Sequence, residues 1–129
     1  MLDTNIVSDL IRNPHGKVAD RLSKIGLPKA CVSILTAGEL RYGARKRGSN
    51  RLSDDIAGAL QRIAVVSFEA PADMAFANVR HHLTTSGQPI GPMDLLIAAH
   101  ALALDLTLVT ANIREFSRVP NLRVENWLD

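Results

Sequence analysis

Four oxygen-bearing side chains recur at one kind of position along the chain. Asp3, Glu39 and Asp94 each lie near the expected start of a helix, and Asn112 follows an expected strand. Carboxylate and amide oxygens are preferred ligands of Mg²⁺ and Mn²⁺, and carboxylates also neutralise the charge of the ion. Without an ion, three clustered carboxylates would repel one another and their pKa values would rise. If the four side chains converge, their chemistry is that of a divalent-metal site.

Each of these side chains also has a purely structural interpretation. Thr36 and Glu39 match a capping box, in which the glutamate hydrogen-bonds back to the helix start. The helix dipole alone favours an acid such as Asp94 in a first turn. Asp3 could be an N-cap, and Asn112 is a common type of turn residue. The shared kind of position nevertheless favours one common site over four separate caps.

The elements that must position these residues are read from hydrophobic periodicity. Apolar residues at helical spacing predict helices over residues 18–25, 35–47, 50–64, 71–86 and 93–104. Short β-leaning runs predict strands over residues 30–33, 65–68, 106–110 and 124–127. Strands that alternate with helices indicate an α/β fold, with a parallel sheet covered by helices on both faces. In such sheets the functional groups gather where loops leave the carboxyl ends of the strands.

The composition limits the other classes of protein. The chain of 129 residues fits a single domain over residues 1–129, and its hydrophobic share of 47% is typical of a globular protein. The single cysteine, Cys31, excludes a disulfide framework and is expected to be a buried small hydrophobe. The sequence shows neither a signal peptide nor a membrane span, so we expect a cytoplasmic protein without a membrane partner.

The histidines do not form a zinc pattern. There are four of them, and none belongs to an H-x-H or H-E-x-x-H motif. His100 lies six residues after Asp94, and the helical period directs it roughly opposite to that carboxylate. We therefore expect a structural role for His100.

Five basic residues lie between positions 41 and 51 with no acidic residue among them: Arg41, Arg45, Lys46, Arg47 and Arg51. Such clusters favour phosphate contacts, and the arginine fork suits them. A solvated helix face, or a patch that meets an acidic segment of a partner, would produce the same pattern. The chain has 15 basic and 13 acidic residues, so without the three candidate metal ligands it has 15 against 10. A small net charge of +2 thus conceals an acidic pocket beside a basic flank.

Four segments, taken in order and spacing, resemble the PIN-domain family and more narrowly the VapC-type toxins of toxin–antitoxin pairs. They are residues 2–6 (LDTNI), 38–43 (GELRYG), 89–101 (PIGPMDLLIAAHA) and 108–116 (LVTANIREF). The resemblance implies an endoribonuclease that hydrolyses RNA phosphodiester bonds with one or two Mg²⁺ or Mn²⁺ ions. It also implies a PIN-like three-layer α/β/α fold with a mainly parallel central sheet of four to five strands.

The resemblance assigns roles to individual residues. It places the family's acidic quartet on Asp3, Glu39, Asp94 and Asn112, which would act as metal ligands. Thr110 matches a catalytic-site hydroxyl of the family. Three further residues are expected to support the ligands from the surrounding shell: Thr4, Asn5 and Glu115. The five basic residues of positions 41–51 would contact RNA or the antitoxin.

The resemblance also implies partners. These are a cognate antitoxin that holds the enzyme inactive, a second copy of the chain in a homodimer, and operator DNA contacted only through the antitoxin. Residues 9–25 and 40–60 carry more apolar positions than one sheet face needs, but the sequence does not locate either protein interface.

Three departures from the family pattern keep other interpretations open. Only two residues precede Asp3, which is short for a strand, so the native chain could start upstream of Met1. Met93 replaces an asparagine of many relatives, and Asn112 is neutral where many have aspartate, which weakens the case for a second ion. The alternatives are a non-catalytic PIN-like module that binds nucleic acid and a DNA-directed PIN nuclease.

Overall fold

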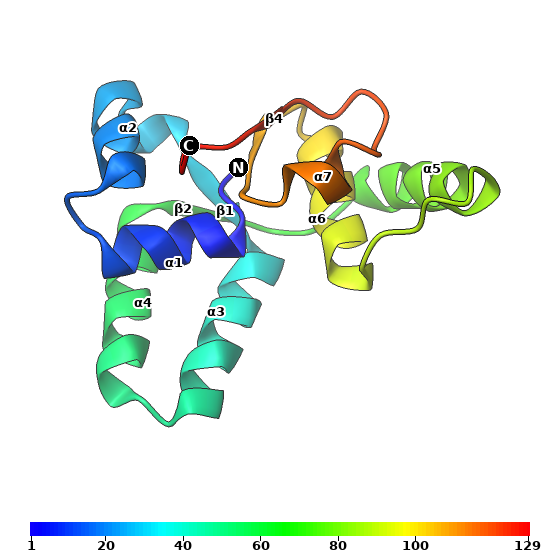
Figure 1. Ribbon diagram of the computed structural model, residues 1–129. Helices are drawn as coiled ribbons and strands as arrows, with labels where there is room; N and C mark the ends of the chain where they lie inside the picture. The colour runs from blue at the N-terminus through cyan, green and yellow to red at the C-terminus, as the bar shows by residue number, and fades with distance from the viewer.

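The computed structural model of the protein describes residues 1–129, and in it short strands alternate with helices (Figure 1). The helices are α1 (Thr4–Arg12), α2 (Lys17–Ile25), the 3₁₀ turn η1 (Leu27–Lys29), α3 (Ile34–Arg47), α4 (Asn50–Arg62), α5 (Ala72–Thr85), α6 (Pro92–Ala103) and α7 (Ile113–Phe116). The strands are β1 (Cys31–Ser33), β2 (Ala64–Val66), β3 (Leu108–Val109) and β4 (Val124–Glu125). No helix is both long enough and apolar enough to cross a membrane.

The strands form two parallel pairs. β1 pairs with β2, and β3 pairs with β4. Residues 1–3 lie between the pairs: Leu2 N donates to Cys31 O, and Val109 N donates to Met1 O, both at 2.8 Å. The contact with β3 is a single parallel bridge between Leu2 and Val109, because α1 begins at Thr4 and ends the extended stretch. The parallel pairing is confirmed, but one sheet of four to five strands is not shown.

Two hydrophobic cores lie on opposite sides of the strands. Met1 and Leu108 belong to the core with α5, α6 and α7, whereas their neighbours Leu2 and Val109 belong to the core with α1, α2 and α4. Successive side chains of an extended chain point to opposite faces, so the same few residues supply both cores. The expected cover of helices on both faces is therefore confirmed.

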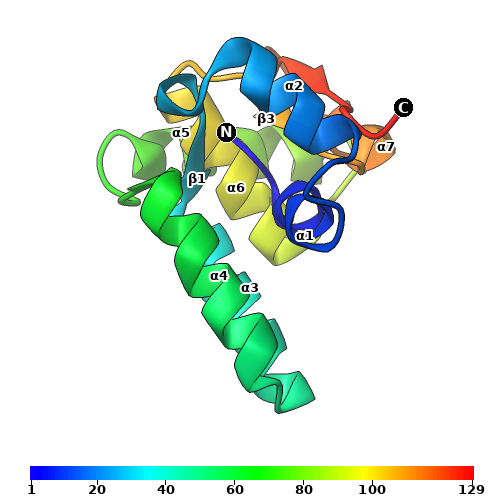
Figure 2. The same cartoon turned by 90° about the vertical axis from the view of Figure 1, so that its left-hand side faces the viewer.

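Helices α3 and α4 form a hairpin that projects from the rest of the molecule (Figure 2). Ser33 caps α3 by accepting a hydrogen bond from Leu35 N, and Gly48 follows the last residue of α3 as its C-cap, with a φ of 64° that favours glycine. Ser49 caps α4 in the same way through Leu52 N. The start of α3 is predicted to within one residue, and the start of α4 is predicted correctly.

The strands are shorter than predicted. β2 ends at Val66 rather than residue 68, and β3 contains only Leu108 and Val109 rather than residues 106–110. A strand continues only while its backbone groups pair with another strand, and Ser67 O instead accepts a hydrogen bond from His100. Cys31 is a free cysteine that is half-buried, not fully buried as expected.

Candidate active site

Asp3 is the most firmly held of the candidate ligands. Its backbone N donates to Val109 O at 2.8 Å, and its side chain caps α1 by accepting from Thr4 N at 2.8 Å. The other carboxylate oxygen accepts from Thr110 Oγ1 at 2.8 Å. The residue is 5% exposed. Asp3 therefore caps a helix, as its structural interpretation predicts, and also presents a carboxylate next to β3.

Glu39 lies in the second turn of α3, not in the first. The capping-box interpretation is wrong, because Ser33 and not Thr36 caps this helix. Glu39 instead accepts a hydrogen bond from Thr4 Oγ1 at 2.8 Å. Since Thr4 directly follows Asp3, this bond ties the α3 carboxylate to the end of the extended segment.

Asp94 lies in the first turn of α6 and faces other carboxylates. The pKa of Asp94 is raised to about 7, mainly by partial burial and further by a hydrogen bond to Glu115 and the charges of Glu115, Asp3 and Glu39. The helix dipole acts in the opposite direction and does not compensate. Asp94 is therefore a carboxyl group that holds a proton near neutral pH when no cation is bound.

Thr110 and Asn112 connect the strand end to the carboxylates. Thr110 is fully buried, and its hydroxyl donates to Asp3 while accepting from Asn112 N at 3.0 Å. Asn112 Nδ2 donates to Glu115 Oε2 at 2.7 Å and lies 3.5 Å from Asp94 Oδ2. Asn5 does not touch a carboxylate, but its Oδ1 accepts from Ala111 N at 3.1 Å and holds the same loop.

Glu115 contacts the cluster directly, whereas the sequence analysis expects only a supporting role for it. Its carboxylate accepts from Gly91 N and from Asn112 Nδ2. These bonds lower the pKa of Glu115, with the Gly91 bond contributing most. A Cβ atom placed on Gly91 would lie 3.6 Å from Glu115 Oε1 and 3.8 Å from Asp94 Oδ2, so both carboxyl groups converge on the start of α6.

The four carboxyl groups have no cationic partner among the ion pairs of the molecule. Those pairs join Arg21 to Glu125, Lys24 to Asp20 and Arg123 to Asp105. The charge of Arg118 contributes to lowering the pKa of Glu115. Hard divalent cations prefer such an all-oxygen set, and burial together with the neighbouring carboxylates raises the pKa of Asp94. The donor chemistry fits Mg²⁺ or Mn²⁺, although no three acidic, histidine or cysteine side chains lie close enough together to form a ready-made cage.

The basic residues lie elsewhere. Arg41, Arg45, Lys46 and Arg47 are exposed on α3, and Arg51 is exposed on α4. Arg47 lies beside one of the candidate carboxylates: a hollow of about 180 Å³ is lined by Thr4 and Glu39 and also by Arg47.

The same hollow is lined by Arg12, a residue that sequence reasoning missed. Thr4, Ser8 and Arg12 recur every four residues on α1, and this helical spacing was the available signal.

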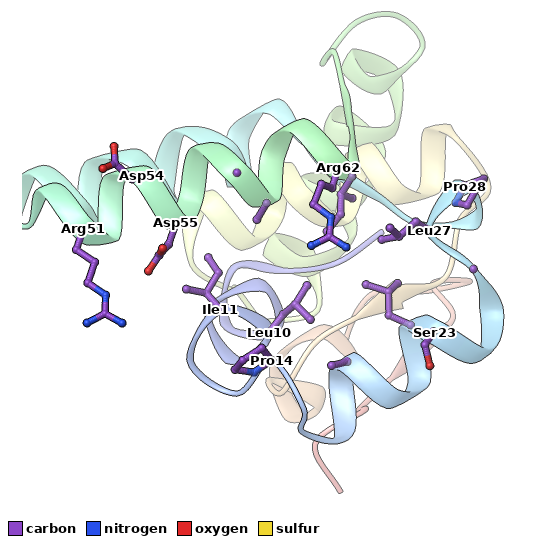
Figure 3. A pocket seen from close by; sticks show the side chains of 16 residues that line it. Leu10, Ile11, Pro14, Ser23, Leu27, Pro28, Arg51, Asp54, Asp55 and Arg62 are labelled. Carbon is purple, nitrogen blue, oxygen red and sulfur yellow. The ribbon is translucent and has the colours of Figure 1, made fainter.

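An apolar groove of about 950 Å³ runs between α1, α2 and α4 (Figure 3). Its walls include Leu10, Ile11 and Leu27, and charged side chains lie along the α4 side: Arg51, Asp54, Asp55 and Arg62. The surplus of apolar positions over residues 9–25 and 40–60 was the sequence signal for this groove, but it did not locate the groove.

Comparisons with known proteins identify the family of the chain. Residues 1–122 match the PIN domain family. The chain is 41% identical to the tRNA(fMet)-specific endonuclease VapC of Shigella flexneri, over 98% of this chain and 96% of that protein. It is 39% identical to ribonuclease VapC2 of Haemophilus influenzae, over 99% of this chain and 97% of that protein.

Solved structures lead to the same family. VapBC2 of Rickettsia felis, bound to a DNA fragment from its promoter, superposes with a TM-score of 0.92 at 35% identity, over 98% of this chain and 97% of that chain. DNA-bound VapBC of Salmonella typhimurium superposes with a TM-score of 0.88 at 35% identity, over 98% and 96%. The resemblance drawn from the four segments is confirmed: the chain belongs to the PIN-domain family and, within it, to the VapC ribonucleases of toxin–antitoxin systems.

Proposed function

We propose that this chain is a divalent-metal-dependent endoribonuclease toxin that hydrolyses RNA phosphodiester bonds and is neutralised by a cognate antitoxin. Residues 1–129 act as one PIN domain, which works in the cytoplasm and pairs as a homodimer. The observation that carries the proposal is the convergence of Asp3, Glu39, Asp94 and Glu115 without an ion-pair partner. An enzyme tolerates such repulsion where a cation is to be bound.

Asp3, Glu39 and Asp94 would hold Mg²⁺ or Mn²⁺, with Asn112 as a neutral fourth ligand. A bound divalent ion polarises a phosphate and lowers the pKa of an attacking water. The neutral amide of Asn112 favours one ion over two, because it contributes no charge to a second one.

The chain's own residues prepare the site for this chemistry. Thr110 fixes the orientation of the Asp3 carboxylate through its hydroxyl. Asn112 aligns Glu115, which in turn shares a hydrogen bond with Asp94. The proton that Asp94 carries near pH 7 leaves when positive charge enters the cluster, so cation binding and proton release are linked.

We propose tRNA as the substrate class, with tRNA(fMet) first among candidates. The support is the 41% and 35% identity to two VapC proteins named as tRNA(fMet)-specific endonucleases. The exposed basic residues of α3 would contact the RNA backbone. Cleavage of tRNA(fMet) should exceed cleavage of an elongator tRNA by at least about 10-fold in kcat/KM, and equal rates would remove the assignment.

The antitoxin is proposed to occupy the groove between α1, α2 and α4. Its apolar walls suit the apolar face of an amphipathic segment, and the charges of both signs on α4 suit a partner with polar flanks. Related VapB–VapC pairs form complexes. We propose that this chain contacts operator DNA only through its antitoxin. Gly58 lies on α4 in the wall of this groove, with open space at its Cβ position, and Gly58→Arg should weaken antitoxin binding by at least about 10-fold in calorimetry. Met74→Arg, at an exposed position of α5, is the control.

Cleavage by antitoxin-free protein tests the central function. Asp94→Asn should abolish Mg²⁺-dependent RNA cleavage while the circular dichroism spectrum is retained. Asp73→Asn is a matched control, because Asp73 also lies in the first turn of a helix but is exposed on α5.

The outcomes separate the three candidate activities. RNA binding without cleavage by the wild type would favour the non-catalytic module. Preferential cleavage of single-stranded DNA would favour the DNA-directed nuclease. Full RNA cleavage by Asp94→Asn would reject this site.

A further inference from the structure

His100 is a buried polar residue that the proposed chemistry does not use. It lies in the last turn of α6 and is 1% exposed. Its Nδ1 lies 2.8 Å from Ser33 Oγ, and its Nε2 lies 3.0 Å from Ser67 O. The ring of Phe68 packs edge-on against it, with centroids 5.1 Å apart. Because both ring nitrogens of this buried imidazole are hydrogen-bonded, His100 has specific polar partners and does not only contribute to packing.

The partners determine the tautomer of His100. Ser67 O is a carbonyl and can only accept, so Nε2 must carry the proton. In the neutral ring Nδ1 is then an acceptor, and the Ser33 hydroxyl must donate to it. Ser33 Oγ in turn accepts from Leu35 N as the N-cap of α3. One directed chain of hydrogen bonds therefore runs from the first turn of α3 through Ser33 to the last turn of α6.

This chain joins the two helices that carry two of the candidate ligands. Glu39 lies on α3, less than two turns after the Ser33 cap, and Asp94 lies on α6, less than two turns before His100. The helices also pack directly against each other. A helix moves as a rigid body over such lengths, so a change at Ser33 or His100 shifts both carboxylates.

We propose that His100 is a positioning residue, which sets the separation of the Glu39 and Asp94 carboxylates through the Ser33 cap. The inference rests on the proposed nuclease function and assigns a role that the ligand set does not require. His100 touches neither substrate nor metal ligand, so it acts only through the two helices.

The neutral ring is the form that this role needs. A proton on Nδ1 would make Ser33 Oγ the acceptor of that bond and leave the buried hydroxyl proton of Ser33 without an acceptor, because the hydroxyl has no other acceptor in contact. The groups that face the ring are the Ser33 hydroxyl, the Ser67 carbonyl and the Phe68 ring, and none of them is charged. Burial lowers the pKa of His100, against the opposing effect of the Ser67 bond, and so keeps the ring neutral.

Kinetics of three variants test the proposal. His100→Phe keeps the ring volume and removes both bonds, whereas His100→Gln keeps an amide donor and an acceptor. His100→Phe should lower kcat by at least about 10-fold at nearly constant KM, because misplaced ligands cost rate more than RNA affinity. His100→Gln should recover most of the loss. Leu83→Ala, a buried position of α5 outside the chain, is the control for lost stability.

A spectroscopic readout keeps the test independent of activity. ¹⁵N NMR of the metal-free protein should show His100 as the neutral ring with the proton on Nε2. A proton on Nδ1, a kcat of His100→Phe within about twofold of the wild type, or an equal loss in Leu83→Ala would overturn the proposal. If the wild type itself fails to cleave RNA, the proposed function is what fails, and the NMR result still decides the hydrogen-bond chain.

Discussion

The carboxylate cluster and the α3–α4 hairpin carry charges of opposite sign and are built in opposite ways. In the cluster, Asp3 is 5% exposed and both of its oxygens accept hydrogen bonds. On the hairpin, the basic side chains are exposed, and none forms an ion pair. The cluster holds its carboxylate oxygens in fixed positions, whereas the hairpin presents exposed charges that hold no fixed partner.

That contrast assigns different tasks to the two regions. Chemistry at a phosphate requires ligands held in fixed positions, because small misplacements are costly to the rate. Attraction of a polyanion requires only charge at moderate distance, and exposed arginines supply it without a fixed geometry. Changes in the cluster should therefore act on kcat and on stability, and changes in the hairpin should act on KM and on salt dependence.

The largest effect is expected for Asp3→Asn. We expect kcat/KM to fall by at least about 1,000-fold, as for Asp94→Asn, because a metal ligand is lost. The variant should also lose about 1–2 kcal/mol of stability, since one amide cannot accept from both Thr4 N and the Thr110 hydroxyl. Nuclease assays and urea unfolding measure the two effects. Unchanged stability would show that the hydrogen bonds to Asp3 are weaker than the geometry indicates.

Glu115→Gln should have an intermediate effect. The amide oxygen can still accept from Gly91 N, but the negative charge beside Asp94 is lost. We expect kcat to fall about 10-fold with little change in KM, because Asp94 loses the partner that orients it. The control is Glu69→Gln on the exposed segment before α5. A loss of RNA affinity at constant kcat would instead place Glu115 at the substrate.

The stability of the metal-free protein should depend on the pH through Asp94. Its pKa is about 7 in the folded protein and 3.8 as the ordinary value, so the folded state binds the extra proton. This proton stabilises the folded state. Its contribution is fully present below about pH 3.8 and is lost as the pH rises through 7. As the pH rises through this range, we expect the free energy of unfolding of the wild type to fall by about 1 kcal/mol relative to that of Asp94→Asn. This figure is reduced because the carboxyl group is partly exposed. Parallel stability curves for the two proteins would contradict this.

The smallest effect is expected on the hairpin. Arg45→Ala should raise KM a few-fold, leave kcat unchanged and reduce the slope of log K against log salt by about 0.7. Binding titrations at several salt concentrations measure the slope. Arg80→Ala on α5 is the control, because it removes an exposed arginine from another helix. An unchanged slope for Arg45→Ala would exclude a phosphate contact at this position.

Local signals in the sequence were sufficient for the long helices. The start of α3 and the start of α4 follow from hydrophobic periodicity, which acts within a few residues. The partners of a strand lie far away in sequence, so the split into two parallel pairs could not be read from Leu108 or Val124 alone. The short helix α7 was missed for a related reason, since four residues carry no periodicity.

The sequence motifs indicate which acids to propose for the site, but they do not predict the contacts of those acids. The motifs named the acids, whereas the Thr4–Glu39 bond depends on packing of α1 against α3. The close approach of Glu115 to Asp94 depends on where α7 meets the start of α6. For the same reason Thr36 was a misleading capping signal: the true cap, Ser33, is defined by where β1 ends.

The most direct test of the account is an NMR titration of the Asp94 carboxyl group with and without Mg²⁺. We predict a midpoint near pH 7 in the metal-free protein, because the neighbouring carboxylates and burial favour the protonated form. With saturating Mg²⁺ the midpoint should fall by more than about one unit, since the cation supplies the missing positive charge. An ordinary midpoint near 3.8 in both samples, or a midpoint near 7 that Mg²⁺ does not move, would contradict the account.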